Sequence, residues 1–134
     1  MRTPAWLAAL AVTLLVSAAA SASTDLAEAA ATAWSRGDHA AARPMLRRLA
    51  LEGDEAAMTL LGVMSARGLG VPRSPAVAAA WYMKAARADH VPALLALADA
   101  FRNGRGVVRD EHLAEALEAR ARNLGAGSDA VAAR

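Results

Sequence analysis

The chain has 134 residues, with 15 Lys and Arg against 13 Asp and Glu, and it contains no Cys. The near-balance of charge, with no basic run longer than Arg47-Arg48, argues against nucleic acid as the partner, and the lack of Cys excludes disulfides and lipid attachment at a cysteine. Abundant Ala and Leu, no Ile and only 4% aromatic residues predict an all-α fold.

The first 22 residues have the pattern of a secretory signal peptide. Arg2 provides a positive start, residues 6–16 form an apolar run, and Ala20 and Ala22 make a small-x-small cleavage site. A membrane-spanning helix needs about 20 apolar residues. We therefore expect cleavage of residues 1–22 and no stable membrane insertion afterwards, with a retained anchor as the alternative. This predicts a periplasmic protein, or a secreted one.

The segment 23–53 is expected to form a first pair of helices. A shift of 36 residues places Asp38 and Ala42 under Ser74 and Ala78, which preserves a capping residue and a small apolar residue at matching places. The sequence match of this segment to the next repeat is weaker than the match between the later copies. It predicts one irregular unit at the start of a repeat array.

A clear repeat of the same 36-residue length occupies the rest of the chain. Nine identities occur without a gap when the sequence is shifted by this step, which is typical of a solenoid. In the first copy these are Ala57, Leu61, Gly68, Gly70, Val71, Arg73, Ala78, Ala80 and Ala85. We predict two copies of one unit, residues 54–89 and 90–125, followed by a flexible tail over residues 126–134.

Each copy is expected to contain two helices joined by a Gly-x-Gly-Val turn. An apolar stripe at helical spacing runs through residues 54–67, and its members are Ala57, Leu61 and Met64. The second helix should open at Ser74 as its N-cap, with Pro75 in the first helical position. Asp110 takes the capping place in the next copy. Gly53 and Gly125 are expected to mark helix ends.

Small residues have two expected roles in this repeat. Four glycines are assigned to structural turns: Gly68, Gly70, Gly104 and Gly106. The first of each pair should end a helix in the left-handed conformation, and the second should let the connection pass close to the next helix. Four alanines are expected on the packed sides of their helices, where a methyl group allows close helix approach: Ala78, Ala85, Ala114 and Ala121.

The pattern Ala-x-x-x-Leu-Gly-x-Met, then Gly-Leu-Gly-Val, then Ala-x-x-Trp-Tyr-Met-Lys-Ala-Ala runs across residues 57–86. It resembles a Sel1-like repeat, and the first helix pair resembles the related tetratricopeptide kind. The resemblance implies a short right-handed α-α superhelix of about three helical hairpins. Ser65, Leu117 and Arg122 depart from the Tyr, Trp and Ala usual in the family, so we expect the last helix to be a cap with one solvated face.

No catalytic residue, metal site or cofactor site is expected. The Gly-x-Gly pairs follow helices and lack the third glycine and the following Lys of phosphate-binding loops. His39, His90 and His112 lack the spacing of a helical metal pair, although Asp110 and Glu111 precede His112. The aromatic side chains are assigned to packing rather than to a ligand cage: Trp34, Trp81, Tyr82 and Phe101.

The surface expected to bind a partner is the concave face of the array. Positions on the first helix of each copy differ between copies while the packing positions agree: Thr59, Val63 and Ala66, then Leu95, Asp99 and Arg102. An equally good interpretation is that they are solvated positions free to vary. We expect an exported adaptor or regulator that binds a peptide or an envelope protein, with oligomeric state left open. The alternatives are a peptidoglycan or β-lactam hydrolase, and a secreted effector or structural component of an envelope complex.

Overall fold

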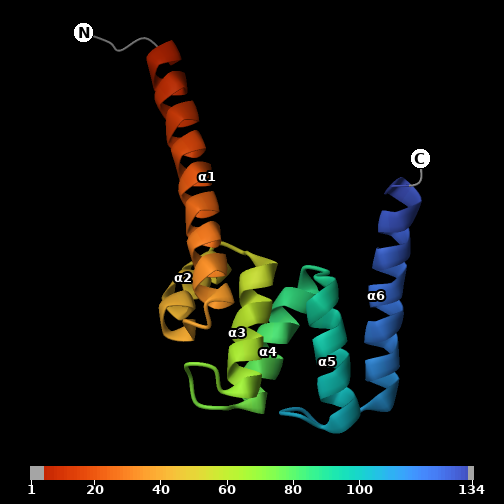
Figure 1. Ribbon diagram of the computed structural model, residues 1–134. Coiled ribbons are helices and arrows are strands. Elements are labelled where there is room, and N and C mark those ends of the chain that lie inside the picture. The colour runs from red at the N-terminus through yellow and green to blue at the C-terminus, as the bar shows by residue number, and fades with distance from the viewer. Residues whose placement is uncertain (1–4, 133–134) are drawn as a thin grey trace. The chain divides into compact units, whose positions relative to one another are not determined.

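The computed structural model describes the backbone of residues 5–132 and the side chains of residues 20–127. Within this part of the chain there are helices and no strands, which confirms the all-α prediction. The helices are α1 (Ala5–Ser35), α2 (His39–Leu51), α3 (Glu55–Arg67), α4 (Pro75–Arg87), α5 (Val91–Asn103) and α6 (Glu111–Ala132) (Figure 1). They fall into two compact units, Met1–Met45 and Leu46–Arg134.

The first unit contains α1 and the start of α2. After α1 ends, Gly37 takes a left-handed backbone, and Asp38 accepts a hydrogen bond from the Ala41 amide at 3.1 Å, which caps α2. The ring of Trp34 meets the ring of His39 edge to face, with 4.9 Å between centroids. These contacts tie the end of α1 to the beginning of α2.

The predicted cleavage site lies inside α1, which continues through Ala22 to Ser35. Residues 1–4 of the predicted signal peptide, and the side chains as far as residue 19, lie outside the described residues. Over the described residues, no helix combines the length and apolar character required to cross a membrane. Export of the protein stays a prediction.

In the second unit, successive helices pack on one another: α3 on α4, α4 on α5 and α5 on α6. Figure 1 shows two antiparallel hairpins side by side, the first formed by α3 and α4 and the second by α5 and α6. Neither hairpin can hide both of its apolar faces alone, so each supplies a wall of the other's core. The predicted solenoid architecture is confirmed.

The helix starts in this unit follow from local capping. Asp54 accepts a hydrogen bond from the Ala57 amide at 2.8 Å, so it precedes α3 as an N-cap. Ser74 accepts from the Val77 amide at 3.3 Å, with Pro75 directly after it. Asp110 accepts from the Leu113 amide at 3.0 Å. The predicted caps at Ser74 and Asp110 are confirmed.

The glycine turns are built as the repeat predicts, with one difference. Gly68 and Gly104 end α3 and α5 in the left-handed conformation, at φ 71° and 64°. A Cβ on Gly106 would collide with the backbone of Pro75. Gly106 therefore permits a close approach of two backbone segments. It approaches the start of α4, in the preceding repeat, rather than the helix that follows it.

The predicted helix end at Gly125 is wrong. Helix α6 continues through Gly125 as far as Ala132. Unlike Gly68, Gly125 does not have a positive φ. Glycine ends a helix only where the chain after it turns back to satisfy the last carbonyls, and no such turn follows Gly125.

The core of the second unit lies where α4 and α5 meet. All four predicted packing alanines are buried, Ala85 and Ala114 at 0% exposure. The core cluster combines such alanines with larger side chains: Tyr82, Leu94 and Leu97, together with Ala121 from α6. Helices lined with alanine approach closely, and this places the side chains of α3, α4 and α5 around a shared hollow.

Candidate functional site

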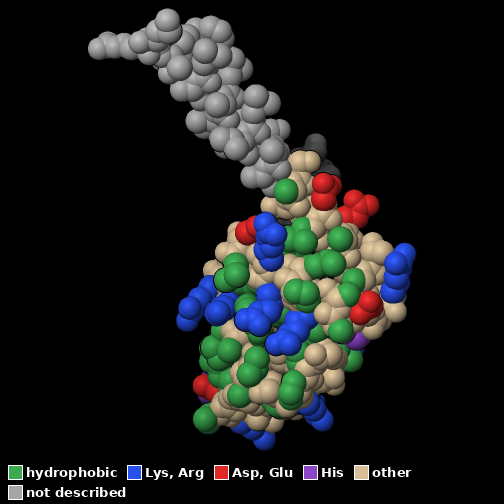
Figure 2. Space-filling model, turned by 90° about the vertical axis from the view of Figure 1, so that its left-hand side faces the viewer, with side chains coloured by type: hydrophobic (Ala, Val, Ile, Leu, Met, Phe, Trp, Pro, Cys, Tyr) green, Lys and Arg blue, Asp and Glu red, His purple; other side chains and the backbone are tan. Residues whose placement is uncertain are grey.

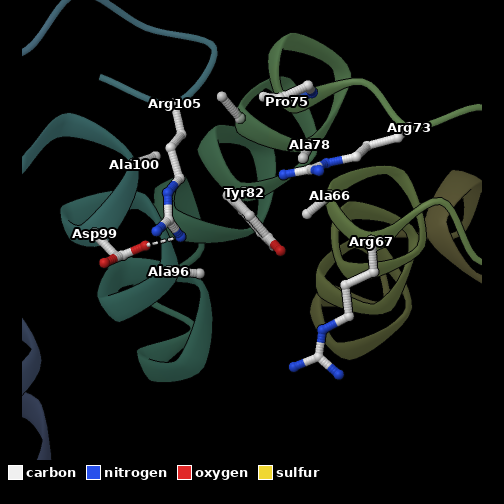
Figure 3. Close-up of a pocket in the computed structure, with 11 residues that line it drawn as sticks. Ala66, Arg67, Arg73, Pro75, Ala78, Tyr82, Ala96, Asp99, Ala100 and Arg105 are labelled. Carbon is white, nitrogen blue, oxygen red and sulfur yellow. Dashed lines mark hydrogen bonds and ion pairs between the residues drawn. The ribbon is translucent and has the colours of Figure 1, made fainter. Parts of the chain in front are cut away.

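A groove of about 420 Å³ runs between α3, α4 and α5 in the second unit (Figure 3). It uses both hairpins, because α3 and α4 belong to the first and α5 to the second. Its lining residues are Ala66, Arg67, Arg73, Pro75, Ala78, Ala79, Tyr82, Ala96, Asp99, Ala100 and Arg105. The groove is therefore lined by alanines and Pro75, with charged residues and one phenol among them.

The floor of the groove carries Tyr82 from α4. Its side chain is buried, and in Figure 3 its hydroxyl end points toward Ala66 of α3. Burial raises the pKa of the Tyr82 phenol, with Arg67 acting in the opposite direction and Asp99 in the same one. No side chain among the described residues forms a hydrogen bond with the Tyr82 hydroxyl. A protonated phenol without a partner can donate a hydrogen bond to a ligand.

The charges of the groove lie on two sides of Tyr82. Arg105 pairs with Asp99 at 3.0 Å, and this pair lies on the α5 side. Arg67 and Arg73 lie across from it, at the end of α3 and in the turn before α4. Neither of these two arginines forms an ion pair with another side chain in the described residues. The groove therefore has a basic side and a locally neutral side.

Two of the six predicted binding positions line this groove, Ala66 and Asp99. Val63 is half-buried against the core cluster. The prediction placed Thr59 on a solvent-facing surface, and this is wrong, because the residue is 8% exposed. Its hydroxyl donates to the Glu55 carbonyl at 2.8 Å and lies 2.9 Å from Nδ1 of His90.

The other two predicted positions lie away from the groove. Leu95 is 48% exposed and does not line it. Arg102 donates hydrogen bonds to Glu118 at 2.6 Å and to Glu111 at 2.9 Å, and both acids belong to α6. These two bonds raise the pKa of Arg102, the one to Glu118 more strongly. Arg102 therefore joins α5 to α6 and is already paired with two carboxylates.

The polar groups of the groove were not predicted from the sequence. Tyr82 was predicted to pack in the core, which is confirmed, but its hydroxyl was not considered, and Arg67 and Arg105 were not singled out. Arg73 was noted only as a repeated position. The three arginines share one signal, because each lies inside a Gly-x-Gly turn or within three residues of one. That signal is weak in sequence, because exposed arginines are common near helix ends.

The carboxylates and histidines that were considered for chemistry do not gather into a site. Asp110 caps α6, Glu111 pairs with Arg102, and His112 is exposed. Among the described residues, no group of three or more His, Asp or Glu side chains is placed to hold a metal ion. Asp110 and Glu111 therefore have structural roles, in capping and in pairing.

Exposed apolar side chains outside the groove are scattered. The large ones are Leu51, Val77, Leu95, Val108 and Leu113. On the face shown in Figure 2, hydrophobic side chains are interspersed with Lys and Arg side chains. Single exposed hydrophobic residues are normal on a folded protein and give no argument for a docking surface.

Comparison with known proteins identifies the repeat. The Sel1 repeat model matches residues 55–90 and 91–125. The chain is similar to the crystal structure of a Sel1 repeat protein from Oxalobacter formigenes, with 30% identity and a TM-score of 0.62 over 63% of this chain and 65% of that one. No curated protein matches the chain.

The chain is also similar to a protective antigen present in uropathogenic Escherichia coli strains, whose structure displays an SLR fold. The identity is 34% and the TM-score 0.62, over 64% of this chain and 18% of that one. The matched part therefore spans less than two thirds of the first structure and less than a fifth of the second.

Proposed function

This chain belongs to the Sel1 repeat family, and we propose that it acts by binding a segment of another protein in the groove between α3, α4 and α5. Sel1 repeats are generally protein–protein interaction modules. The observation that carries the proposal is the composition of the groove. Its walls are small and apolar, and among the described residues its phenol hydroxyl has no hydrogen-bond partner and its Arg67 and Arg73 have no ion pair.

The shape of the groove fits an extended peptide. Its volume of about 420 Å³ accommodates a few residues. Ala66 and Ala96 face the hollow from α3 and α5, so a peptide backbone can come close to both helices. Because the two hairpins share the groove, the site exists only in the stacked repeats and not in one hairpin alone.

The proposal includes export and the absence of catalysis. Residues 1–22 support export through their signal-peptide pattern, so the partner would be a periplasmic or secreted protein. Sel1 repeats typically form non-catalytic scaffolds. Asp110 and His112 give a hydrolase no support, since Asp110 caps α6 and His112 is exposed. An adaptor or regulator is the function that these observations favour.

Selection from an unbiased library of displayed peptides tests the proposal. We expect enriched peptides to bind the full chain and to lose binding to Ala96→Trp, because an indole at this position fills the groove. Ala116→Trp is the matched control, since Ala116 is exposed on α6 and outside the groove. Equal binding to both variants would place the site elsewhere, and failure to enrich any peptide would refute peptide binding.

A second measurement avoids any effect of a bulky residue on packing. A photoreactive amino acid in place of Arg67, at the exposed rim, should cross-link to an enriched peptide. The same replacement at Arg109, exposed but outside the groove, should not. Cross-linking of equal yield at both positions would contradict the proposal.

A further inference from the structure

We infer that the occupant of the groove is an acidic, extended segment of a partner protein, with a carboxylate held between Arg67, Arg73 and Tyr82. This inference rests on the proposed function, and it adds the chemistry of the partner. The starting observation is that all three side chains present hydrogen-bond donors at one hollow. A carboxylate is the protein group that accepts from all of them.

Arg67 and Arg73 differ from Arg105, the third arginine that lines the groove, in lacking an acid. Arg102, Arg105 and Arg120 of the same unit are each paired with an Asp or Glu side chain. Arg67 and Arg73 are exposed, line the groove and have no such pair among the described residues. Guanidinium groups form bidentate, charge-assisted hydrogen bonds with carboxylates. These two side chains can therefore accept an acid from outside the chain.

The rest of the groove decides how such a segment lies. Figure 3 shows Asp99 and Arg105 on the side opposite Arg67 and Arg73, with Tyr82 between the two pairs. The ion pair of 3.0 Å neutralises Asp99, so the acid does not repel an incoming carboxylate strongly. The segment would thus place its carboxylate toward α3 and its backbone or a neutral side chain toward α5. Small side chains along both walls permit this approach.

Nucleic acid fits the same groove less well. Binding of single strands uses aromatic faces on which bases stack, and Tyr82 is only 8% exposed. Two unpaired arginines also give a short basic patch, whereas nucleic-acid sites extend such patches along many phosphates. A protein segment with a few carboxylates matches the size and the charge of the groove.

Fluorescence anisotropy with defined probes tests the inference on the full chain. The probes are an amidated, fluorescein-labelled (Gly-Ser-Glu-Glu)3 peptide, its counterpart with every Glu changed to Gln, and a 12-nucleotide oligo-dT. We expect the Glu peptide to bind about tenfold more tightly than the Gln peptide, with affinity falling as salt is raised. Equal affinities for the two peptides, no binding of the Glu peptide, or tighter binding of oligo-dT would overturn it.

Single substitutions test whether Arg67 and Arg73 cause the preference for the Glu peptide. Arg67→Gln and Arg73→Gln should each weaken the Glu peptide about fivefold or more, and leave the Gln peptide unchanged. Arg109→Gln is the control, because Arg109 occupies the place of Arg73 in the next repeat and does not line the groove. Tyr82→Phe should weaken the Glu peptide by a smaller factor. A loss at Arg109 equal to the loss at Arg73 would contradict the assignment.

The binding of library peptides shows whether the acidic specificity alone is wrong or whether the proposed function is wrong as well. If library peptides bind in the groove but tolerate exchange of every Asp and Glu for the amide, the groove binds proteins and the acidic specificity is wrong. If library peptides are insensitive to Ala96→Trp and the photoreactive residue at Arg67 gives no cross-link, both proposals fail together.

Discussion

The ring of Tyr82 lies directly against the backbone of Gly62. A Cβ built on this glycine would stand 2.7 Å from Cδ1 of the ring and closer still to Cε1. Gly62 belongs to α3 and Tyr82 to α4, so the missing side chain sets the distance between the two helices. It also sets the depth at which the phenol lies in the groove.

Replacing Gly62 with alanine should therefore destabilise the protein although alanine is the better helix former. Overpacking of this kind costs roughly 1–3 kcal/mol, and the gain in helix propensity returns about 1 kcal/mol. Urea unfolding followed by circular dichroism measures the difference. Gly125→Ala is the control, since its Cβ would meet no atom within 4 Å and should raise stability. Equal gains in both variants would disprove the contact.

Thr59→Val should lower the free energy of unfolding by about 1–2 kcal/mol, because it leaves Nδ1 of His90 without its partner. The Thr59 hydroxyl lies 2.8 Å from the Glu55 carbonyl and 2.9 Å from Nδ1 of His90, so the substitution removes both contacts. Thr32→Val is the matched control, since the Thr32 hydroxyl bonds only the Glu28 carbonyl in the described structure. Similar losses in the two variants would show that the contact between Thr59 and His90 contributes nothing to the free energy of unfolding.

The hydrogen bond from Arg102 holds the pKa of Glu118 below its ordinary value of 4.5. A depressed pKa means that the folded chain prefers the ionised form. This contribution to stability is present above pH 4.5 and is lost as the pH falls through the lower, folded value. Glu118→Gln should therefore remove part of the acid sensitivity of unfolding between neutral pH and pH 3.

Glu115→Gln, an exposed position on the same helix without an ion pair among the described residues, serves as the comparison. It should leave the pH dependence as in the parent chain. Melting temperatures collected across the acid range supply the measurement. Indistinguishable profiles for Glu118→Gln and the parent would count against the pairing with Arg102.

Tyr82 is the only tyrosine in the sequence, so tyrosinate absorbance reports on it alone. Burial raises its pKa above 10.0, and we expect the folded chain to titrate at higher pH than the chain in urea. The neutral phenol then contributes stability below pH 10, and this is lost as the pH rises toward the raised value. Arg67→Gln should raise the pKa further, because Arg67 acts to lower it. An unshifted titration would mean that the phenol is solvated.

Local sequence signals were sufficient for the repeat and its turns. Ser74 and Asp110 cap helices through contacts three residues away, and Gly68 ends α3 because its own backbone takes the left-handed conformation. These features depend on neighbours in the chain, so a single sequence reveals them. Gly125 shows the limit. The same residue type stays helical where the following chain does not turn.

Which of the predicted positions can bind a partner depends on contacts that each side chain makes with other helices in the folded chain. Thr59 belongs to one copy and His90 to the start of the next, so their contact hides a residue that the helix pattern alone leaves outside. Arg102 stays partly exposed, with 37% of its side-chain surface accessible, but its charge is already paired with two carboxylates of α6. Periodicity within one helix cannot report such partners, which lie on other helices.

The sequence by itself determined the helices, their capped starts, the left-handed turns and the 36-residue repetition, because each depends on residues a few positions apart or on exact recurrence. Only the tertiary structure decided which polar groups stay unsatisfied. Folding of the second hairpin pairs Arg102 with acids of α6 and Arg105 with Asp99, whereas Arg67 and Arg73 form no ion pair among the described residues. Stacking of the two hairpins places Tyr82 between these two sides of the groove. The physical reason is that hydrogen bonds and ion pairs are satisfied across helices, by distances that the chain sets only when it is folded.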